Sequence, residues 1–425
     1  MDPAVLTGIL IAILLLLNVE IFVVLGIGAV LFVVMTGSYT LEALGVSVFA
    51  SLNSFPLLAM PLFILTGDLI VESGIAKLLI NFSKSLIGWL RGGLAMTTIL
   101  TSGFFAAISG SNSATAAAMG KIMVPEMKKE NYPDSFAAAT VASGGVVGII
   151  IPPSVVFVVY GVATGVPVGD LFLGGIIPGF LMVAAMALVA FLQCSRNKWG
   201  NMSKFNMRDV LKSLWGAKLA FIATLIILGG IYGGIFTPTE AGAVACAYCL
   251  IAGLLSKGGI KLKKLPDIME NSAKVNGMVA PVVALALVIA EIIAYLKIPA
   301  VLVGAIMGIS SNPIAIVFVI FFILLVAGCL METAPNIIIL TPLLIPIANS
   351  LGFNPIHFGV FVVVSLAIGF ITPPIGLNLF VSSSITGVPV TTIARDSLPY
   401  VLILMVVALV IAFVPGLSLS LLPTK

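Results

Sequence analysis

Charged side chains are scarce in this sequence. Only 8% of its 425 residues are Asp, Glu, Lys or Arg, whereas 60% are hydrophobic. A soluble domain carries about a quarter charged residues, so this composition excludes a soluble protein and predicts an all-α polytopic membrane protein. The apolar runs that approach or reach the roughly 20 residues of a spanning helix are 6–17, 21–35, 171–193, 219–235 and 400–414.

Histidine and cysteine are also rare, with one His and four Cys. The cysteines lie in or near apolar segments and offer no disulfide framework, and the Cys246–Cys249 pair lacks the second pair of a metal site. His357 is expected in a loop on the outer side. With no Cys-His pairing and no phosphate-binding Gly-x-x-x-x-Gly-Lys motif, the sequence argues against an intramembrane enzyme and an ATP-driven pump.

The net charge of +4 does not indicate nucleic-acid binding, because the basic residues gather in loops that flank apolar segments. The positive-inside rule places these loops in the cytoplasm. The apolar N-terminus lacks a basic leader and a small-residue cleavage site, so we expect it to be a first membrane helix. The cytoplasmic basic residues are Lys128 and Lys129, then Arg196, Lys198, Lys204, Arg208, Lys212 and Lys218, and finally Lys257, Lys261, Lys263 and Lys264.

Two apolar segments are interrupted in the same way. Each of 148–154 and 369–376 contains a Pro-Pro pair, and the same Thr-Gly-Val-Pro-Val sequence follows at 164–168 and 386–390. The chain therefore contains an internal duplication with two broken transmembrane helices. Paired interruptions at corresponding positions of two halves are typical of a transport site near the bilayer midplane.

A pair of short apolar stretches joined by small polar residues precedes each break. The first pair, at 92–128, has basic residues at both ends, whereas the matching stretch, 313–350, has none. We predict two re-entrant helical hairpins that enter from opposite faces, which makes the repeats inverted. Irregular backbone at this depth is tolerated only in buried positions or beside an aqueous cavity, so both tips and both breaks should converge on one cavity.

These features divide the chain into five predicted segments, of which the two hairpin segments form a transport domain. The first segment ends with an amphipathic arm at 75–90 that we expect along the membrane interface. The segments are 1–91 (scaffold helices and the arm), 92–170 (first hairpin and broken helix), 171–312 (linking and scaffold helices), 313–395 (second hairpin and broken helix) and 396–425 (a C-terminal transmembrane helix).

A helix that ends within the membrane exposes carbonyls on one side of the break and amides on the other. Carbonyl ends suit cations and amide ends suit anions. The first tip has hydroxyl, amide and backbone oxygens without a carboxylate, which favours Na⁺ over a divalent ion. The predicted Na⁺ ligands are Ser109, Ser111, Asn112, Gly144, Gly145 and Gly148 at the first site, with Ser113 beside them, and Glu332, Thr333, Gly369 and Thr372 at the second.

The transported anion is expected between the two tips. Glu332 is the most informative residue there, because a carboxylate inside a membrane is costly and marks function. Asp68, Glu72 and Glu291 lie near segment ends and are expected at the interface. Close packing of small residues explains single serines but not the duplicated arrangement. The predicted substrate-binding residues are Ser111, Asn112, Ser113, Ser154, Glu332, Thr333 and Asn378.

This pattern resembles the large membrane subunit of tripartite ATP-independent periplasmic (TRAP) transporters. The resemblance covers most of the chain, and one departure is Glu332, where many relatives carry an aspartate. A capping box at 237–240, with Thr first and Glu last, belongs to the resemblance and predicts a helix start. The motifs that carry the resemblance lie at 109–115, 148–154, 232–240, 337–342 and 371–374.

The resemblance implies an importer of organic acids in the bacterial inner membrane that is driven by two or more Na⁺ ions rather than ATP. It also implies a separate small membrane subunit of about four helices, a periplasmic substrate-binding protein and an elevator movement of the hairpin-bearing domain. Sialic acids and C4-dicarboxylates are the family's typical substrates, and sialic acid is favoured. A single-component Na⁺/carboxylate symporter and a passive channel remain as alternatives.

Overall fold

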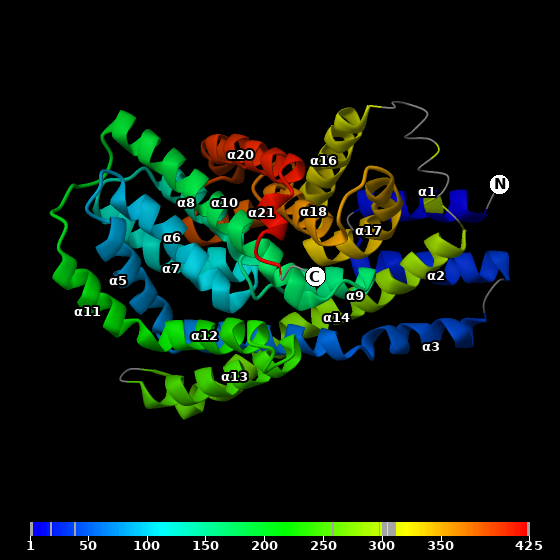
Figure 1. Ribbon diagram of the computed structural model, residues 1–425. Helices are drawn as coiled ribbons and strands as arrows, with labels where there is room; N and C mark the ends of the chain where they lie inside the picture. Colours follow the sequence, from blue (N-terminus) through cyan, green and yellow to red (C-terminus); the bar gives the residue numbers. More distant parts are fainter. Residues whose placement is uncertain are drawn as a thin grey trace.

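The computed structural model describes residues 3–17, 19–37, 40–256, 259–296, 298–299, 304 and 312–422. Within these ranges every regular element is a helix (Figure 1). In the described part of the chain, seven helices are long and apolar enough to cross a membrane, or eight if the bent pair α11 (Met207–Gly216) and α12 (Lys218–Tyr232), which meet at 63°, form one span. The all-helical, polytopic prediction is thus confirmed. Lys257, one of the predicted cytoplasmic residues, lies outside the described ranges.

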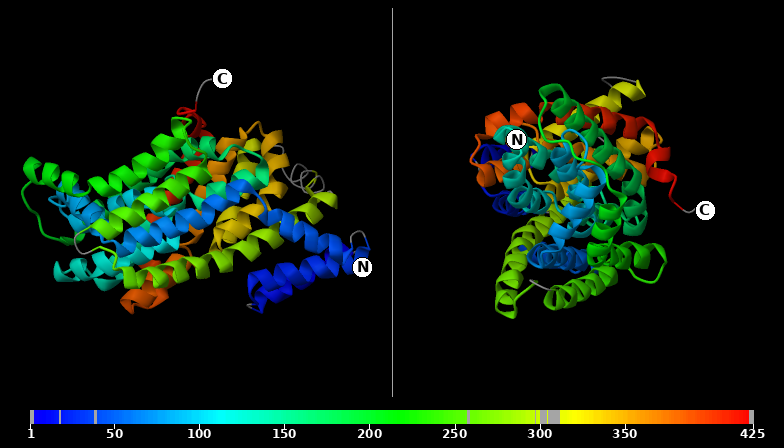
Figure 2. Two further views of the ribbon diagram at one scale, coloured as in Figure 1. Left: turned by 90° about the horizontal axis from the view of Figure 1, so that it is seen from below. Right: turned by 90° about the vertical axis from the view of Figure 1, so that its left-hand side faces the viewer.

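The seven helices include both helices of the second predicted hairpin, so length alone allows each of them to cross. Figure 2 shows the N-terminal helices α1 (Pro3–Leu16), α2 (Ile21–Thr36) and α3 (Leu41–Leu52) at the end of the molecule opposite α11. The seven spans are α4 (Ala59–Glu72) with the preceding turn η1 (Phe55–Leu58), α10 (Val168–Asn197), α13 (Pro238–Leu255), α14 (Leu265–Tyr295) with η3 (Leu262–Lys264), α16 (Pro313–Leu330), α17 (Thr333–Ser350) and α20 (Val390–Phe413).

The duplication seen in the sequence is present as two copies of one helix order. Each copy has a helical hairpin, a central helix, an irregular break and a short helix. The first copy consists of α6 (Gly93–Ser109), α7 (Asn112–Lys129), α8 (Asp134–Gly145) with η2 (Val146–Ile149), and α9 (Val155–Thr164). The second consists of α16, α17, α18 (Pro355–Gly369) and α19 (Leu377–Thr386). Both predicted helix breaks are therefore confirmed, and both Pro-Pro peptide bonds are cis.

The repeated Thr-Gly-Val-Pro-Val sequence forms the same turn in both copies. Gly165 and Gly387 end α9 and α19 with φ of 74° and 73°, values in the left-handed region that favours glycine. The preceding threonine hydroxyl donates to the carbonyl four residues earlier and accepts from the amide two residues later, at 164 and again at 386. The repeated sequence thus encodes a helix stop followed by a new helix.

The two copies pack crosswise. Helix α7 of the first hairpin lies against α19, and α17 of the second hairpin lies against α9. Side chains also join the copies: Asn378 Nδ2 donates to the Ala142 carbonyl over 3.0 Å, and the Tyr160 hydroxyl donates to the Pro355 carbonyl over 2.9 Å. Helices α8 and α18 are buried almost along their whole length, so they form the centre of the core.

A second group of helices surrounds this core. Helix α4 packs against α13, α14 and α6, and the capping box predicted for α13 is present at Thr237 and Glu240. The arm forms α5 (Ile75–Ile87), whose apolar face packs on α6 while Lys77 and Lys84 remain exposed. Short α21 (Gly416–Leu419) packs on α10.

One prediction about histidine is wrong. His357 lies not in a loop but in the first turn of α18, with only 1% of its surface exposed. Its ring stacks on Phe353, and Nε2 lies 3.1 Å from the Ala412 carbonyl oxygen. Pro355 begins this helix, and proline fits the first helical position because its missing amide would have no partner there anyway.

Candidate functional site

The first hairpin tip is a two-residue turn between α6 and α7. Gly110, with φ of 61°, ends α6, and Ser111 caps α7 by accepting from the Ala114 amide. Thr115 Oγ1 donates to the Ser111 carbonyl over 2.7 Å and lies 3.0 Å from Ser109 Oγ. The tip is therefore fixed by its own polar residues.

The second tip is also fixed by a polar residue of its own, although that residue and its hydrogen bonds differ from those of the first tip. Helix α16 ends at Leu330 and α17 begins at Thr333, with Glu332 at the N-cap position. Buried Asn336 closes the turn, because its Nδ2 donates to the carbonyls of Ala327 and Met331 over 3.0 and 3.1 Å. Glu332 is left free of this network, and its side chain is exposed to the cavity described below.

Glycines let each tip approach the break of its own repeat. A methyl group at Gly148 would overlap the Ser111 carbonyl and lie 2.9 Å from the Asn112 amide, while one at Gly369 would overlap Gly328. A methyl group at Gly145 would lie 3.0 Å from the Asn112 carbonyl oxygen, so this glycine also lies close to the tip. Tip and break are thus in contact in both repeats, as the sequence predicted.

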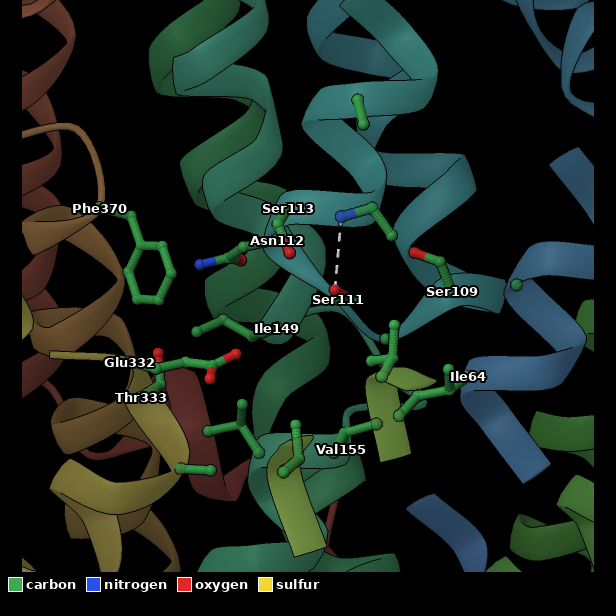
Figure 3. Close-up of a pocket in the computed structure, with 18 of the residues that line it drawn as sticks. Ile64, Ser109, Ser111, Asn112, Ser113, Ile149, Val155, Glu332, Thr333 and Phe370 are labelled. Atoms are coloured by element: carbon green, nitrogen blue, oxygen red, sulfur yellow. Dashed lines mark hydrogen bonds between the residues drawn. The ribbon is translucent and has the colours of Figure 1, made fainter. Parts of the chain in front are cut away.

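Both tips also line one cavity of about 390 Å³ (Figure 3). In the close-up, Asn112 and Ser113 lie above the space and Glu332 and Thr333 extend into it from the side. The two breaks contribute Ile149 and Phe370, but none of the four break prolines lines the wall. The predicted site residues on the wall are Ser109, Ser111, Asn112, Ser113, Glu332 and Thr333.

Two of these residues have buried polar atoms without partners. Both side-chain polar atoms of Asn112 and the hydroxyl of Thr333 make no hydrogen bond to any residue that the structure describes, although Asn112 is only 3% exposed and Thr333 only 1%. Buried polar groups are nearly always paired, so unpaired ones on a cavity wall indicate groups that a ligand would satisfy. The cavity therefore has the donors and acceptors of a binding site.

The other predicted residues lie behind the wall. Ser154 caps α9 and donates to the Ile149 carbonyl over 2.6 Å, which closes the first break. Thr372 Oγ1 donates to the Ile368 carbonyl over 2.8 Å, and Asn378 joins the two repeats as described above. Gly144 faces Ser102 of α6 rather than the tip. None of Gly144, Gly145, Gly148, Ser154, Gly369, Thr372 and Asn378 lines the cavity.

Three helices begin at the cavity. The first residues of α7, α9 and α17 all line its wall: Asn112, Val155 and Thr333. The amides of a first helical turn have no partner within the helix and carry partial positive charge. Among the residues that the structure describes, no Lys, Arg or His lines this cavity, so these amide ends and any bound cations supply the positive potential that an anion requires.

Asp68 is a wall residue that the sequence analysis did not place there. It lies inside α4, half-buried, and accepts a hydrogen bond from Ser272 of α14. It was assigned to the interface because it lies close to the end of an apolar run. Its position inside an apolar helix is the signal that would have identified it, since carboxylates within membrane helices mark function.

No cluster of three or more His, Cys, Asp or Glu residues that could hold a metal ion occurs within the described ranges. The cavity wall instead has hydroxyl, amide and backbone oxygens and the separate carboxylates of Asp68 and Glu332, which are ligand types that hard cations use.

The sequence matches a family model over residues 8–417, and that family is described as "Tripartite ATP-independent periplasmic transporter, DctM component". The chain belongs to this family. Like its relatives, it is a transporter permease and not an enzyme.

The names of several DctM-family relatives state a substrate. The C4-dicarboxylate TRAP transporter large permease of Pseudomonas aeruginosa is 38% identical over 93% of both chains, and the sialic acid TRAP transporter large permease of Vibrio cholerae is 34% identical over 92% of both. The isethionate TRAP transporter permease of Oleidesulfovibrio alaskensis is 38% identical over 96% of this chain. This chain spans 64% of that relative's length.

Two solved membrane transporters have the same fold. The Alcanivorax borkumensis YdaH transporter superposes with a TM-score of 0.61 at 16% identity, covering 90% of both chains. Neisseria gonorrhoeae MtrF, described among antimetabolite efflux pumps, gives 0.61 at 11% identity, covering 89% of this chain and 85% of its own. At these identities the likeness concerns the fold alone.

Proposed function

We propose that this protein imports an organic acid anion across the bacterial inner membrane, coupled to the entry of two or more Na⁺ ions. The observation that carries the proposal is the cavity where three helix N-termini meet two polar hairpin tips. The amide ends favour the carboxylate of the substrate. The tip oxygens favour Na⁺, which in turn offsets the charge of Glu332.

The transport cycle follows from the two repeats. The hairpins α6–α7 and α16–α17 are re-entrant from opposite faces, the repeats are inverted, and the cavity between the tips holds substrate near the midplane. Residues 92–170 and 313–395 move together as a transport domain, against scaffold helices from 1–91 and 171–312, and 396–425 follows as a C-terminal helix. Crosswise packing of the copies supports their movement as one body.

The partners belong to the same proposal. A small membrane subunit of about four helices joins the scaffold, and a periplasmic binding protein delivers the substrate. The large-permease relatives carry C4-dicarboxylates and sialic acid, as their names state. Sialic acid is our first choice, because hydroxyl donors on a substrate would pair with the acceptor oxygens of the tips.

Uptake into liposomes tests the proposal. The protein and its small subunit are reconstituted, and entry of radiolabelled sialic acid or succinate is measured with an inward Na⁺ or choline gradient, with and without the binding protein. We expect uptake that requires both Na⁺ and the binding protein. Uptake without the binding protein would favour a single-component Na⁺/carboxylate symporter, and uptake that never exceeds equilibrium would indicate a passive channel.

A further inference from the structure

Asp68 lies where the scaffold touches the first hairpin tip. Its neighbour Gly67 is so close to the tip that a methyl group there would lie 3.3 Å from Ser109 Cα. The hydroxyl of Ser272 donates to one oxygen of the Asp68 carboxylate. No other hydrogen bond or ion pair to Asp68 occurs in the part of the chain that the structure describes, so its second oxygen is free for a ligand.

Asp68 also borders a second cavity. This cavity has a volume of about 320 Å³ and shares Asp68, Ala114 and Ala117 with the cavity between the tips. Its remaining polar wall consists of Glu72, Lys121, Lys264, Asp267 and Asn271. Lys264 belongs to a loop that the positive-inside rule assigns to the cytoplasm, so the second cavity lies on the cytoplasmic side of the first.

The charges of the second cavity are partly paired. Lys264 Nζ lies 3.5 Å from Glu72 Oε2, and both side chains are largely exposed. Asp267 and Lys121 are exposed at the same wall, without an ion pair in the described part of the chain. Among the described residues, Asp68 is thus the one charged side chain that lines both cavities.

We propose that Asp68 is a cation site on the scaffold, through which Na⁺ passes between the first tip and the cytoplasm. The proposal rests on the sodium coupling and the elevator movement proposed above. Tip oxygens are neutral, so a carboxylate beside them adds a strong attraction for a monovalent cation. Because Asp68 belongs to the scaffold, it can help the first site only while the tip lies beside α4, as in this structure.

Thermal unfolding of the purified complex with its small subunit tests the site without knowledge of the substrate. A ligand that binds the folded state raises the melting temperature with its concentration. For Asp68→Asn, which keeps the Ser272 hydrogen bond, we expect the NaCl concentration for half of the maximal shift to rise about tenfold. Choline chloride is the ionic-strength control. Asp267→Asn removes the same charge from a residue that lines the second cavity only, so its melting temperature should respond to NaCl as that of the wild type does.

The outcomes separate the two proposals. If the wild-type complex gains no more stability from Na⁺ than from choline, the sodium coupling itself is refuted, and this inference with it. If the wild type responds and Asp68→Asn responds identically, only the role of Asp68 is overturned. Should Asp68→Asn not fold, Ser272→Ala and Asp68→Glu provide the test: the first should weaken the Na⁺ response about threefold, and the second should retain it.

Transport from a defined side gives a second test. The binding protein, added outside, selects the molecules whose docking face points outward, so internal Na⁺ then meets only the cytoplasmic face. In Asp68→Asn we expect inhibition of uptake by internal Na⁺ to require about tenfold more Na⁺, with the dependence on external Na⁺ unchanged. An equal shift on both sides would contradict a site that the scaffold contributes.

Discussion

Glu332 is the carboxylate on the second tip, and its side chain does not help to hold the tip together. Asn336, not Glu332, closes the turn, and no ion pair to Glu332 occurs in the described residues. Its side chain is exposed to the cavity, while its backbone sets the start of α17. Replacing its charge should therefore alter binding much more than folding.

We expect Glu332→Gln to reduce Na⁺-dependent uptake at least about tenfold, because the neutral amide loses the attraction for the cation at the second tip. Glu332→Asp should keep most of the activity, since the charge stays on the same N-cap backbone. Initial uptake rates against Na⁺ concentration measure the effect, with melting temperature as the folding control. Full activity of Glu332→Gln would show that the second site does not use this carboxylate.

At the residue scale, the sequence identified the residues of the hairpin tips more accurately than the other residues that line the cavity. Ser111, Asn112 and Thr333 were recognisable because polar residues between apolar stretches have few other reasons to occur. Ser154 and Thr372 belong to the same motifs, yet their hydroxyls bond to nearby carbonyls. Such local bonds depend on the rotamer and on backbone atoms four or five residues away, which the motif does not specify.

Among the elements, the contact between α4 and the first tip is the one that an elevator movement must break. Gly67 of α4 and Ser109 of the tip are adjacent, and a Cβ built on Gly67 lies 3.4 Å from the Ser109 Cβ. That separation is close to the span of a disulfide. The four native cysteines are buried or half-buried, so they interfere little.

A double variant, Gly67→Cys with Ser109→Cys, should form a disulfide under oxidation and lose transport, because scaffold and hairpin can no longer separate. Dithiothreitol reduces the disulfide and should restore the transport rate that the double variant has before oxidation. Each single variant, treated in the same way, shows what the substitutions alone cost. If the cross-linked protein transports as fast as the same variant with its thiols reduced, movement of the first hairpin past α4 is ruled out.

Element boundaries followed the sequence wherever a local signal existed. Both breaks and the capping box of α13 were predicted from nearby residues. The loop position expected for His357 was wrong, because Asn354 and Pro355 form the cap and the first position of α18. The start of α18 is capped locally, since Asn354 Oδ1 accepts from the Ile356 amide, whereas the contact of His357 Nε2 with the Ala412 carbonyl joins this helix to the distant α20.

For the whole molecule, the proposed inversion of the repeats predicts which face each hairpin enters. Lys129 at the end of α7 and Ile314 at the start of α16 are both exposed. We expect Lys129→Cys to react with an impermeant maleimide only from the cytoplasmic face, and Ile314→Cys only from the periplasmic face, because the hairpins enter from opposite sides. Labelling of intact cells and of inverted vesicles measures this.

A cysteine-free background, with the four native cysteines replaced by serine or alanine, provides the control for that labelling. Reaction of both introduced cysteines from one face would contradict inverted repeats and would require parallel ones.

The sequence by itself determined that this is a helical membrane protein, that it is duplicated and that each half contains a break. Those properties follow from hydrophobicity and backbone chemistry within short segments. The sequence also predicted that the two tips share a cavity, but only the tertiary structure decided which side chains line it and that Asp68 is among them. These contacts link α4, α7, α14 and α17 across hundreds of residues, and they depend on helix packing at glycines such as Gly67 and Gly148, which no local pattern encodes.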